Sequence, residues 1–262
     1  MSFKKKKSLA PGINTVVIGN AHHQGARENQ QDSFAISDIS NLDLCRRHGV
    51  FCVLADGMGG MYAGGAVSNL VTQSMLRQFS DDDSPASSDV LLLRMVEDAN
   101  RLLTQQMDGM EKGGSTVVAV IIQDGCISWA TVGDSRLCLV RGGAMIQINR
   151  EHSYGIELDE RAAKNEISWE EAKMDPQRPS LTSYLGMDRI KLVDRNIRPV
   201  RLLPGDRVLL MSDGVFNTLS DDEILATITD DPHESAVLLE QSVIGKALPY
   251  QDNFTAIILK MM

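Results

Sequence analysis

Five aspartates lie where apolar segments of the sequence begin or end. Asp56 and Asp213 end the apolar segments VFCVLAD and RVLLMSD, and a glycine follows each of them. Asp32 and Asp252 come just before SFAIS and FTAIILK, while Asp134 lies between two further apolar segments in TVGDSR. Carboxylates gathered at strand ends repel one another unless a cation lies between them, and oxygen ligands together with water suit Mg²⁺ or Mn²⁺. The pattern therefore indicates a divalent-metal site held by rigid strands.

The segment DGMGGMYAGG, residues 56–65, is rich in glycine, so the chain after Asp56 carries few side chains. Gly57 lets the backbone turn sharply and bring its carbonyl oxygen near an ion. Asp-Gly is also a common turn dipeptide, and the glycines are equally suited to letting a helix pack closely. A nucleotide-binding loop is disfavoured because no lysine follows the glycines at P-loop spacing and the βαβ context of a dinucleotide fold is missing.

Arg27, in GARENQQDSF, lies five residues before Asp32. Arginine is suited to bidentate recognition of phosphate, and the alternative is a surface arginine paired with Glu28 or another acid. Three histidines, His22, His23 and His152, are candidates for a general acid. His22 and His23 are adjacent and would point to opposite faces of a strand, so a structural role is favoured for each.

Short β-branched segments dominate the sequence and predict a largely antiparallel β architecture. The expected strands are NTVVIGNA, SFAIS, GVFCVLAD, GSTVVAVIIQ, CISWATVGD, RLCLVRG, AMIQIN, DRVLLMSD and FTAIILK. The segments QDGC and RGGAM join neighbouring strands as tight hairpin turns.

Helical spacing of apolar residues appears between these strands. It predicts an antiparallel helix pair over 67–79 and 89–107, joined by the polar segment SDDDSPASSD. Two more helices are expected near the C-terminus, one after the capping box of Ser220 and Glu223 and one over 233–248.

Residues 151–186 are polar and form an insertion between strands. Two short helical pieces are expected there, over 157–166 and 168–173, the second opened by a capping box of Ser168 and Glu171. Long insertions of this kind are often functional lids. The alternative is a surface insertion that has no role in function. With no internal repeat or low-complexity linker, residues 13–262 are expected to form one domain, preceded by a flexible basic N-terminus over 1–12.

Composition limits the partners of the protein. The formal net charge of −9 disfavours nucleic acid and anionic membranes, and the exception is KKKK at residues 4–7. No apolar segment approaches the roughly 20 residues of a membrane span, and an apolar signal-peptide core is not seen, so no membrane insertion is expected. The four cysteines, Cys45, Cys52, Cys126 and Cys138, lack zinc-site spacing. Buried free thiols in a reducing, cytoplasmic compartment are the favoured interpretation.

In order, GARENQQDSF, VLADGMGG, GGSTVVAVII, TVGDSRLCLV, LTSYLGM, GDRVLLMSDGVFNTLSDDEI and QDNFTAIIL resemble the metal-dependent PPM family of protein serine/threonine phosphatases, the type 2C phosphatases. The bacterial branch of the family is the most similar, and the resemblance covers about residues 16–260. It implies an α+β fold, a four-layer α-β-β-α sandwich of two mainly antiparallel sheets flanked by helices. Residues 151–186 fall where the family carries its flap beside the active site.

The resemblance also implies roles for the site residues. Arg27 matches the phosphate-binding arginine, and Asp32 matches a carboxylate that orients metal-bound water. Asp56 matches the bridge between two Mg²⁺ or Mn²⁺ ions, with the Gly57 carbonyl on one of them. Asp213 and Asp252 match the carboxylates that hold the other ion. A hydroxide activated by two ions about 3.5–4 Å apart would attack phosphorus directly, without a phosphoenzyme.

Three positions depart from the family pattern, namely Gln31, Asn217 and Met58. Gln31 stands where the family often has Glu, which alters a water-mediated contact to metal. Asp134 matches a ligand of a third metal, but Asn217 replaces the usual Asp there, so tight third-metal binding is not expected. Met58 stands where many eukaryotic relatives have His, so another group must protonate the leaving alkoxide.

The function implied is hydrolysis of phosphoserine and phosphothreonine in a phosphorylated protein substrate, opposing a bacterial serine/threonine kinase in signalling. A catalytically weak pseudophosphatase that binds a phosphoprotein or partner is the alternative, and Gln31 and Asn217 keep it open.

Overall fold

The computed structural model describes residues 16–59, 63–84, 86–106 and 113–262. The predicted flexible N-terminus over 1–12, with its lysines at 4–7, lies outside the described residues. So do residues 60–62 of the glycine-rich segment and position 107, the last of the predicted second helix.

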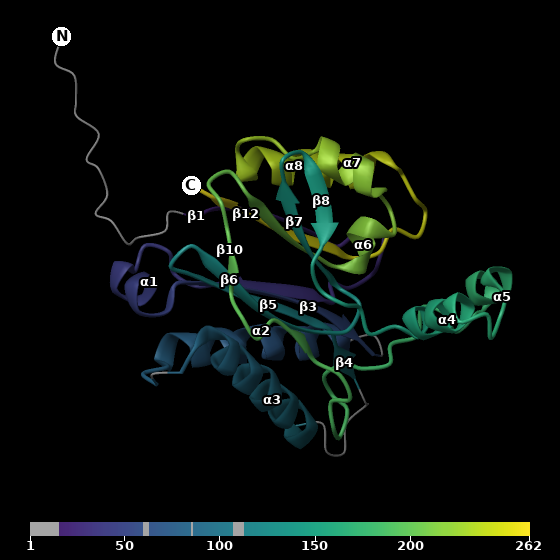
Figure 1. The fold of residues 1–262 in the computed structure, drawn as a ribbon, viewed down its shortest axis with the longest axis horizontal. Coiled ribbons are helices and arrows are strands. Elements are labelled where there is room, and N and C mark those ends of the chain that lie inside the picture. The colour runs from purple at the N-terminus through teal and green to yellow at the C-terminus, as the bar shows by residue number, and fades with distance from the viewer. Residues whose placement is uncertain (1–15, 60–62, 85, 107–112) are drawn as a thin grey trace, which may run out of the picture.

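Two antiparallel sheets form the centre of the molecule (Figure 1). Sheet 1 consists, in spatial order, of β1 (Val16–His23), β12 (Phe254–Met261), β11 (Arg207–Met211), β7 (Arg136–Arg141) and β8 (Ala144–Gln147). Sheet 2 consists of β10 (Val200–Arg201), β6 (Cys126–Val132), β5 (Val117–Gln123), β3 (Val50–Met58) and β2 (Asp32–Ile36). Two short strands extend sheet 2, since β4 (Gly114–Ser115) pairs with β3 and β9 (Asp194–Arg195) pairs with β6.

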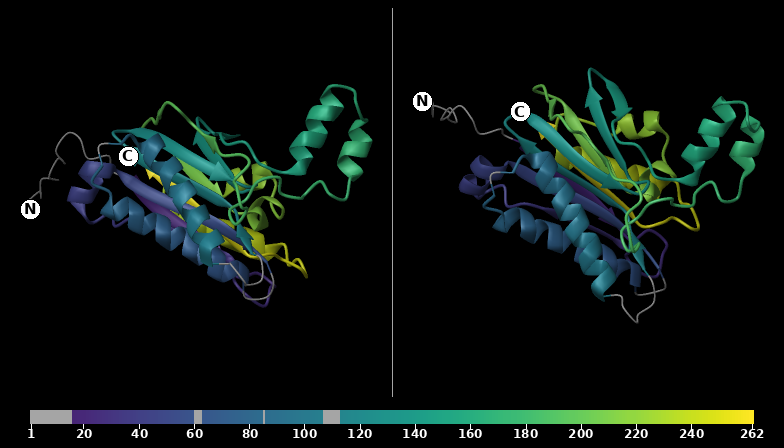
Figure 2. Two further views of the ribbon diagram at one scale, coloured as in Figure 1. Left: turned by 90° about the horizontal axis from the view of Figure 1, so that it is seen from below. Right: turned by 60° about the horizontal axis from the view of Figure 1, so that its bottom comes forward.

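Helices cover the outer face of each sheet. On sheet 2 lie α2 (Ala63–Asp81) and α3 (Ser88–Gln106), and on sheet 1 lies α8 (Pro232–Gly245) with α7 (Asp221–Ala226) nearby. Figure 2 shows the same layers from two further directions. The predicted α+β four-layer α-β-β-α sandwich is therefore confirmed.

Strand β3 shows why the layers form. Its residues are apolar on both faces, and successive side chains of a strand point to opposite faces. Phe51 and Val53 pack among the residues of α2 and α3, while Cys52 and Leu54 pack in the core between the two sheets. A strand buried on both faces belongs in the middle of a layered fold.

The helices bury the faces that the spacing predicts. Val67, Val71, Met75 and Phe79 of α2 are all buried against sheet 2. Helix α8 begins at the cap residue Asp231, whose side chain accepts from the His233 backbone N–H, and it packs its apolar residues on sheet 1. The capping boxes at Ser168 and Ser220 are both formed.

Four elements were not predicted from the sequence. They are the helices α1 (Leu42–His48) and α6 (Asp213–Phe216) and the two-residue strands β9 and β10. Each is too short to carry a periodic pattern of apolar residues.

Residues 151–186 form a protrusion, called the flap below. It contains α4 (Tyr154–Ala163) and α5 (Trp169–Met174), which stand apart from the sandwich in every view (Figures 1 and 2). The first helix begins three residues before the predicted piece at 157. A small core of its own, Leu158, Ala162 and Ala172, holds the flap together, and Arg178 pairs with Asp159 at 2.8 Å.

The two tryptophans occupy contrasting places. Trp129 of β6 is 8% exposed, and its Nε1 donates to Asp194 at 3.2 Å. Trp169 opens α5 in the flap and is 53% exposed.

All four cysteines are free thiols, but the prediction that they are buried is only half right. Cys52 and Cys138 are buried, and burial raises the pKa of Cys138 to about 12. Cys45 and Cys126 are partly exposed because they lie at the periphery, one in α1 and the other at the first residue of β6. Among the described residues, no helix is long and apolar enough to cross a membrane.

Candidate functional site

A cavity of about 270 Å³ lies where strands of the two sheets end. It is called the acidic cavity below. Six of the predicted site residues line it, namely Arg27, Asp56, Gly57, Asp134, Asp213 and Asp252. Asp32 lies buried behind the cavity rather than in its wall, and Asn217 is exposed outside the lining, where it contacts the Asp213 carboxylate. Chain segments separated by more than 200 residues therefore meet at one place.

Asp56 is positioned by three neighbouring strands. It lies opposite Asp32 in the register of β2 and β3. Its backbone N–H donates to the Thr116 hydroxyl at 3.0 Å, and its carbonyl accepts from the Thr116 N–H at 2.8 Å and the Ser115 hydroxyl at 3.0 Å. The Gly57 N–H donates to the Gln31 carbonyl at 3.0 Å. The carboxylate is thus carried by backbone that is fixed from both sides.

Gly57 and Gly64 explain why side chains are missing after Asp56. A Cβ on Gly57 would lie 2.0 Å from the Gly64 carbonyl oxygen, and a Cβ on Gly64 would lie 2.8 Å from the Gly57 carbonyl oxygen. No larger residue fits at either position, since real Cβ atoms are not found so close to backbone. The first turn of α2 therefore lies directly against the end of β3, so close helix packing is one reason for these glycines.

Asp213 and Asp252 reach the cavity from adjacent segments. Asp213 does not end a strand as predicted but is the first residue of α6, after the cap residue Ser212. Asp252 immediately precedes Asn253, whose N–H donates to Asp252 Oδ1 at 2.8 Å. The Asn253 side chain accepts from the Gln31 N–H at 2.8 Å and so joins the β12 end to the β2 end.

Arg27 pairs with a carboxylate of the cavity. Its Nη2 donates to Asp252 Oδ2 at 2.7 Å, and the side chain is 57% exposed. The sequence left open a pairing with an acid, and the partner is Asp252 rather than Glu28. The guanidinium lies at the mouth of the cavity, where it can reach a phosphate group from solvent.

Asp32 is held by two hydroxyl groups. Its Oδ2 accepts from Ser212 Oγ and from Thr255 Oγ1, each at 2.7 Å, while its buried Oδ1 has no partner among the described residues. Burial raises the pKa of Asp32 to about 6, although the Thr255 and Ser212 hydrogen bonds favour the charged form. His22 Nδ1 lies 2.9 Å from Thr255 Oγ1 and extends this chain of hydrogen bonds.

The crowded carboxylates of the acidic cavity favour a bound cation. Burial, and after it the charge of Asp32, raises the pKa of Asp56 well above its usual range. Burial and the charge of Asp213 raise the pKa of Asp134 to about 7. Burial and the charge of Asp252 raise the pKa of Asp213. Four carboxylates thus share a cavity whose described lining contains one cationic side chain, Arg27.

The donors fit a hydrated divalent ion. In the described part of the chain, no three His, Cys, Asp or Glu side chains already converge on one point. A compact all-protein cage, as a structural zinc would need, is therefore not formed there. Carboxylate and carbonyl oxygens arranged around an open cavity suit Mg²⁺ or Mn²⁺, which keep several waters.

The residues that depart from the family pattern, Gln31, Met58 and Asn217, lie in the acidic cavity or next to it. Asn217 Nδ2 donates to Asp213 Oδ2 at 3.1 Å, so the amide occupies one oxygen of that carboxylate. Gln31 and Met58 line the acidic cavity.

None of the three histidines lines this cavity. His23 stacks on Phe254, and its Nδ1 accepts from the Gly25 N–H. His152 is buried, and its Nδ1 accepts from the Gly133 N–H at 3.2 Å. The structural role favoured for the histidines fits these contacts.

Four supporting residues were not singled out from the sequence. They are Thr116, Ser212, Asn253 and Thr255, which position the aspartates through the contacts described above. Ser212 and Asn253 adjoin site aspartates in the chain, which is a local signal. For Thr116 and Thr255 the sequence carries no comparable signal.

Comparison with known proteins gave consistent matches. A family model described as protein phosphatase 2C matches residues 19–237. Protein phosphatase PhpP of Streptococcus pneumoniae serotype 2 is 30% identical over 199 residues, which are 74% of this chain and 78% of PhpP. The solved structure of the S. agalactiae serine/threonine phosphatase has a TM-score of 0.81 at 25% identity, over 95% of this chain and 100% of the other. The catalytic domain of the serine/threonine protein phosphatase PstP in complex with two manganese ions has a TM-score of 0.72 at 26% identity, over 95% and 100% of the two chains.

Proposed function

The chain belongs to the protein phosphatase 2C family, and we propose that it hydrolyses phosphoserine and phosphothreonine in proteins with two Mg²⁺ or Mn²⁺ ions. The observation that carries this proposal is the gathering of Asp56, Asp134, Asp213 and Asp252 beside Arg27 in one cavity. Four carboxylates, of which Asp56, Asp134 and Asp213 are largely desolvated, face a single arginine in the described lining, which leaves an excess of negative charge. The manganese complex of the similar PstP domain supports a divalent metal in this place.

Each residue has a defined task in this proposal. Asp56 and the Gly57 carbonyl would hold one ion, and Asp56, Asp213 and Asp252 would hold the other. Such ions, when bound, lower the pKa of water and offset the charge of a phosphate group. Asp134 is proposed as a weak third-metal ligand, because Asn217 contributes an amide in place of a carboxylate.

Arg27 is the proposed phosphate-binding residue. A guanidinium can donate two parallel hydrogen bonds to phosphoryl oxygens, and it stabilises the charge that develops there during displacement. Arg27 must leave Asp252 at least in part to do so, and its exposure leaves it free to move.

Asp32 would orient the attacking water. Ser212 and Thr255 hold its Oδ2, so its free Oδ1 is fixed in direction and available to accept a hydrogen bond. The described lining of the cavity contains no cysteine, serine or histidine that would serve as a nucleophile. The Thr116 hydroxyl, which also lines the cavity, is held by the Asp56 N–H at 3.0 Å and lies 2.8 Å from Ser135 Oγ, and the aspartates are assigned to the metal ions. Direct attack by water on phosphorus is therefore proposed in place of a phosphoenzyme.

The natural substrate is proposed to be a phosphoprotein generated by a serine/threonine kinase of a bacterial cell. We place the reaction in a reducing compartment, the cytoplasm, because all four cysteines are unpaired.

The test is phosphate release from a phosphothreonine peptide with Mn²⁺, with Mg²⁺ and with a chelator. Metal-dependent release is expected, and Asp213→Asn is expected to abolish it. Asp124→Asn is the matched control, since Asp124 is an exposed turn residue between β5 and β6 whose φ of 51° suits asparagine. Phosphopeptide binding without release by folded wild-type protein would favour the pseudophosphatase instead, and full release by Asp213→Asn would contradict the proposed metal site.

A further inference from the structure

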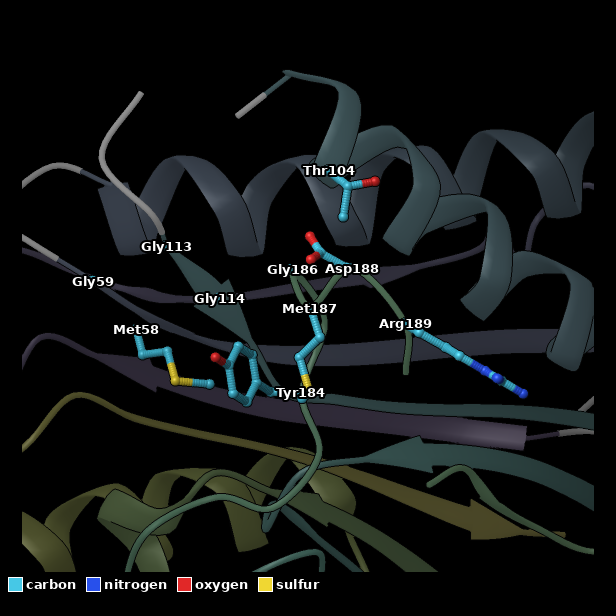
Figure 3. A pocket seen from close by; sticks show the side chains of 10 residues that line it. All are labelled: Met58, Gly59, Thr104, Gly113, Gly114, Tyr184, Gly186, Met187, Asp188 and Arg189. Carbon is cyan, nitrogen blue, oxygen red and sulfur yellow. The ribbon is translucent and has the colours of Figure 1, made fainter. Parts of the chain in front are cut away.

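A second cavity, of about 770 Å³, adjoins the acidic cavity. It is called the side cavity below, and Figure 3 shows it from close by. Met58 and Gly59 at the end of β3 line both cavities. The side cavity is completed by Thr104 of α3, by the start of β4, and by residues of the segment 184–189, at the end of the flap and just after it. The catalytic proposal makes no use of it.

One wall of the side cavity is apolar. Figure 3 shows Met58, Tyr184 and Met187 along one side and Thr104 and Asp188 on the other. Thioether side chains are flexible and polarisable, so they adapt to apolar groups of different shape. The tyrosine ring adds a flat apolar surface with a polar end.

The Tyr184 ring packs against the backbone at Gly114. A Cβ on Gly114 would lie 2.7 Å from Cδ2 of the Tyr184 ring, so only glycine allows the ring to lie against β4. Leu185, the next residue, is buried and exchanges two backbone hydrogen bonds with Ser115, at 2.8 and 2.9 Å. Tyr184 is therefore attached firmly to the edge of sheet 2.

The following turn is fixed as well. Gly186 has a φ of +105°, a conformation that favours glycine. The buried side chain of Asn100 on α3 accepts from the Gly186 N–H at 2.8 Å and donates to the Met187 carbonyl at 3.0 Å. The apolar wall is thus preformed, as small-ligand and side-chain pockets usually are.

The two cavities differ in charge. Carboxylates dominate the acidic cavity, whereas the described lining of the side cavity carries one acid, Asp188, and one base, Arg189, both exposed. In the described lining these two charges balance, so the apolar contacts of Met58, Tyr184 and Met187 are the feature that can select a substrate side chain there.

The spacing of Asp56 and Met58 along β3 indicates how far apart the two cavities lie. Met58 lies two residues after Asp56 in one extended strand, which corresponds to about 7 Å. A substrate chain advances about 3.3–3.6 Å per extended residue. A peptide whose phosphorylated residue occupies the acidic cavity therefore reaches the side cavity with a residue about two to four positions away.

We propose that the side cavity is a substrate subsite that takes a large apolar side chain, such as Leu, Met or Phe, two to four residues from the phosphorylated residue. This inference rests on the proposed phosphatase function. It names a preference within the phosphoprotein substrates, and it assigns Tyr184 and Met187 as specificity-determining residues.

The experiment compares phosphothreonine peptides that differ only at positions two to four residues from the phosphothreonine, where Leu, Gly or Asp is placed on either side. Hydrolysis of p-nitrophenyl phosphate, which has no flanking residues, is measured in parallel with Mn²⁺ present. For wild-type protein, kcat/KM is expected to be about tenfold higher for a Leu peptide than for the Gly and Asp peptides.

Variants assign the preference to the side cavity. Tyr184→Ala and Met187→Ala are expected to reduce the Leu-to-Gly ratio towards one, mainly through KM. Tyr184→Phe keeps the ring and is expected to keep the ratio. Ile197→Ala, at a residue 74% exposed outside both cavities, is the control that is expected to keep it too.

The outcomes separate the two proposals. Equal hydrolysis of Leu, Gly and Asp peptides by an enzyme active on p-nitrophenyl phosphate overturns the subsite alone, and so does a Leu preference that both alanine variants retain. Failure of folded protein to hydrolyse any of these substrates with metal overturns the phosphatase function, and the subsite with it.

Discussion

Removal of one carboxylate charge is expected to stabilise the metal-free protein in a pH-dependent way. Asp134→Asn is the substitution of choice, because asparagine keeps the shape of the side chain and an oxygen that can accept from the backbone. In the folded protein, burial and the charge of Asp213 raise the pKa of Asp134 to about 7 from 3.8. Folding without metal therefore forces this group to take up a proton or to remain charged at a cost.

The direction in which the stability of the metal-free protein changes with pH follows from proton binding. Between pH 3.8 and about 7, the unfolded chain has lost this proton while the folded chain keeps it. The unfolded state binds fewer protons, so stability falls as pH rises through this window. At about 1.36 kcal/mol per pKa unit, the cost of Asp134 is about 2 kcal/mol at pH 5 and about 4 kcal/mol at pH 8.

The assay is urea denaturation followed by circular dichroism, in the presence of a chelator, at pH 5 and at pH 8. Asp134→Asn is expected to gain about 2–3 kcal/mol more free energy of unfolding at pH 8 than at pH 5. The exposed Asp124→Asn is the control and is expected to show no such difference. Saturating Mn²⁺ is expected to shrink the gain, because bound cations offset the buried charge.

Two results would refute this reasoning. A gain of equal size at both pH values would mean that asparagine improves packing rather than removing charge. No gain at pH 8 would mean that Asp134 is solvated well enough to ionise without cost.

Three further predictions follow from the contacts of the site and of the sheets. Gly57→Ala is expected to abolish metal-dependent hydrolysis, because its Cβ would lie 2.0 Å from the Gly64 carbonyl oxygen; isothermal titration with Mn²⁺ would then show lost binding, and unchanged binding would contradict the assignment. Thr255→Val is expected to lower kcat about 10- to 100-fold with little change in KM, since Asp32 loses one of its two hydroxyl donors; steady-state kinetics with equal effects on both constants would argue against it. Asp206→Ala is expected to cost about 2–3 kcal/mol in urea denaturation, because this 3%-exposed carboxylate accepts from Arg141 and from the Leu203 N–H; a loss below about 0.5 kcal/mol, as for surface changes, would contradict it.

Much of the fold is predictable because local patterns agree with tertiary structure. The double-sided apolar run of β3 and the helical stripe of α2 each have one stable solution, a strand inside a layered fold and a helix on its outer face. The strand β10 is different, since it is two residues long and pairs with β6 only at Val200 and Arg201. No pattern of two residues distinguishes a strand from a loop.

The aspartates of the site could be found because they interrupt apolar segments. Their mutual arrangement could not be found in this way, since it depends on pairing between distant strands. Asp32 and Thr255, for example, are 223 residues apart in the chain and meet at 2.7 Å. The pairing of Arg27 with Asp252 depends in the same way on the neighbouring positions of β1 and β12.

The contrasting places of the two tryptophans give the protein two built-in optical reporters. Trp129, enclosed in sheet 2, should emit at short wavelength and resist collisional quenchers, whereas Trp169 in the flap should emit at longer wavelength and be quenched readily. The emission spectrum therefore separates into one component from the sandwich and one from the flap. Substrate or metal that alters the flap changes the quenchable component alone, so the flap can be followed without any label.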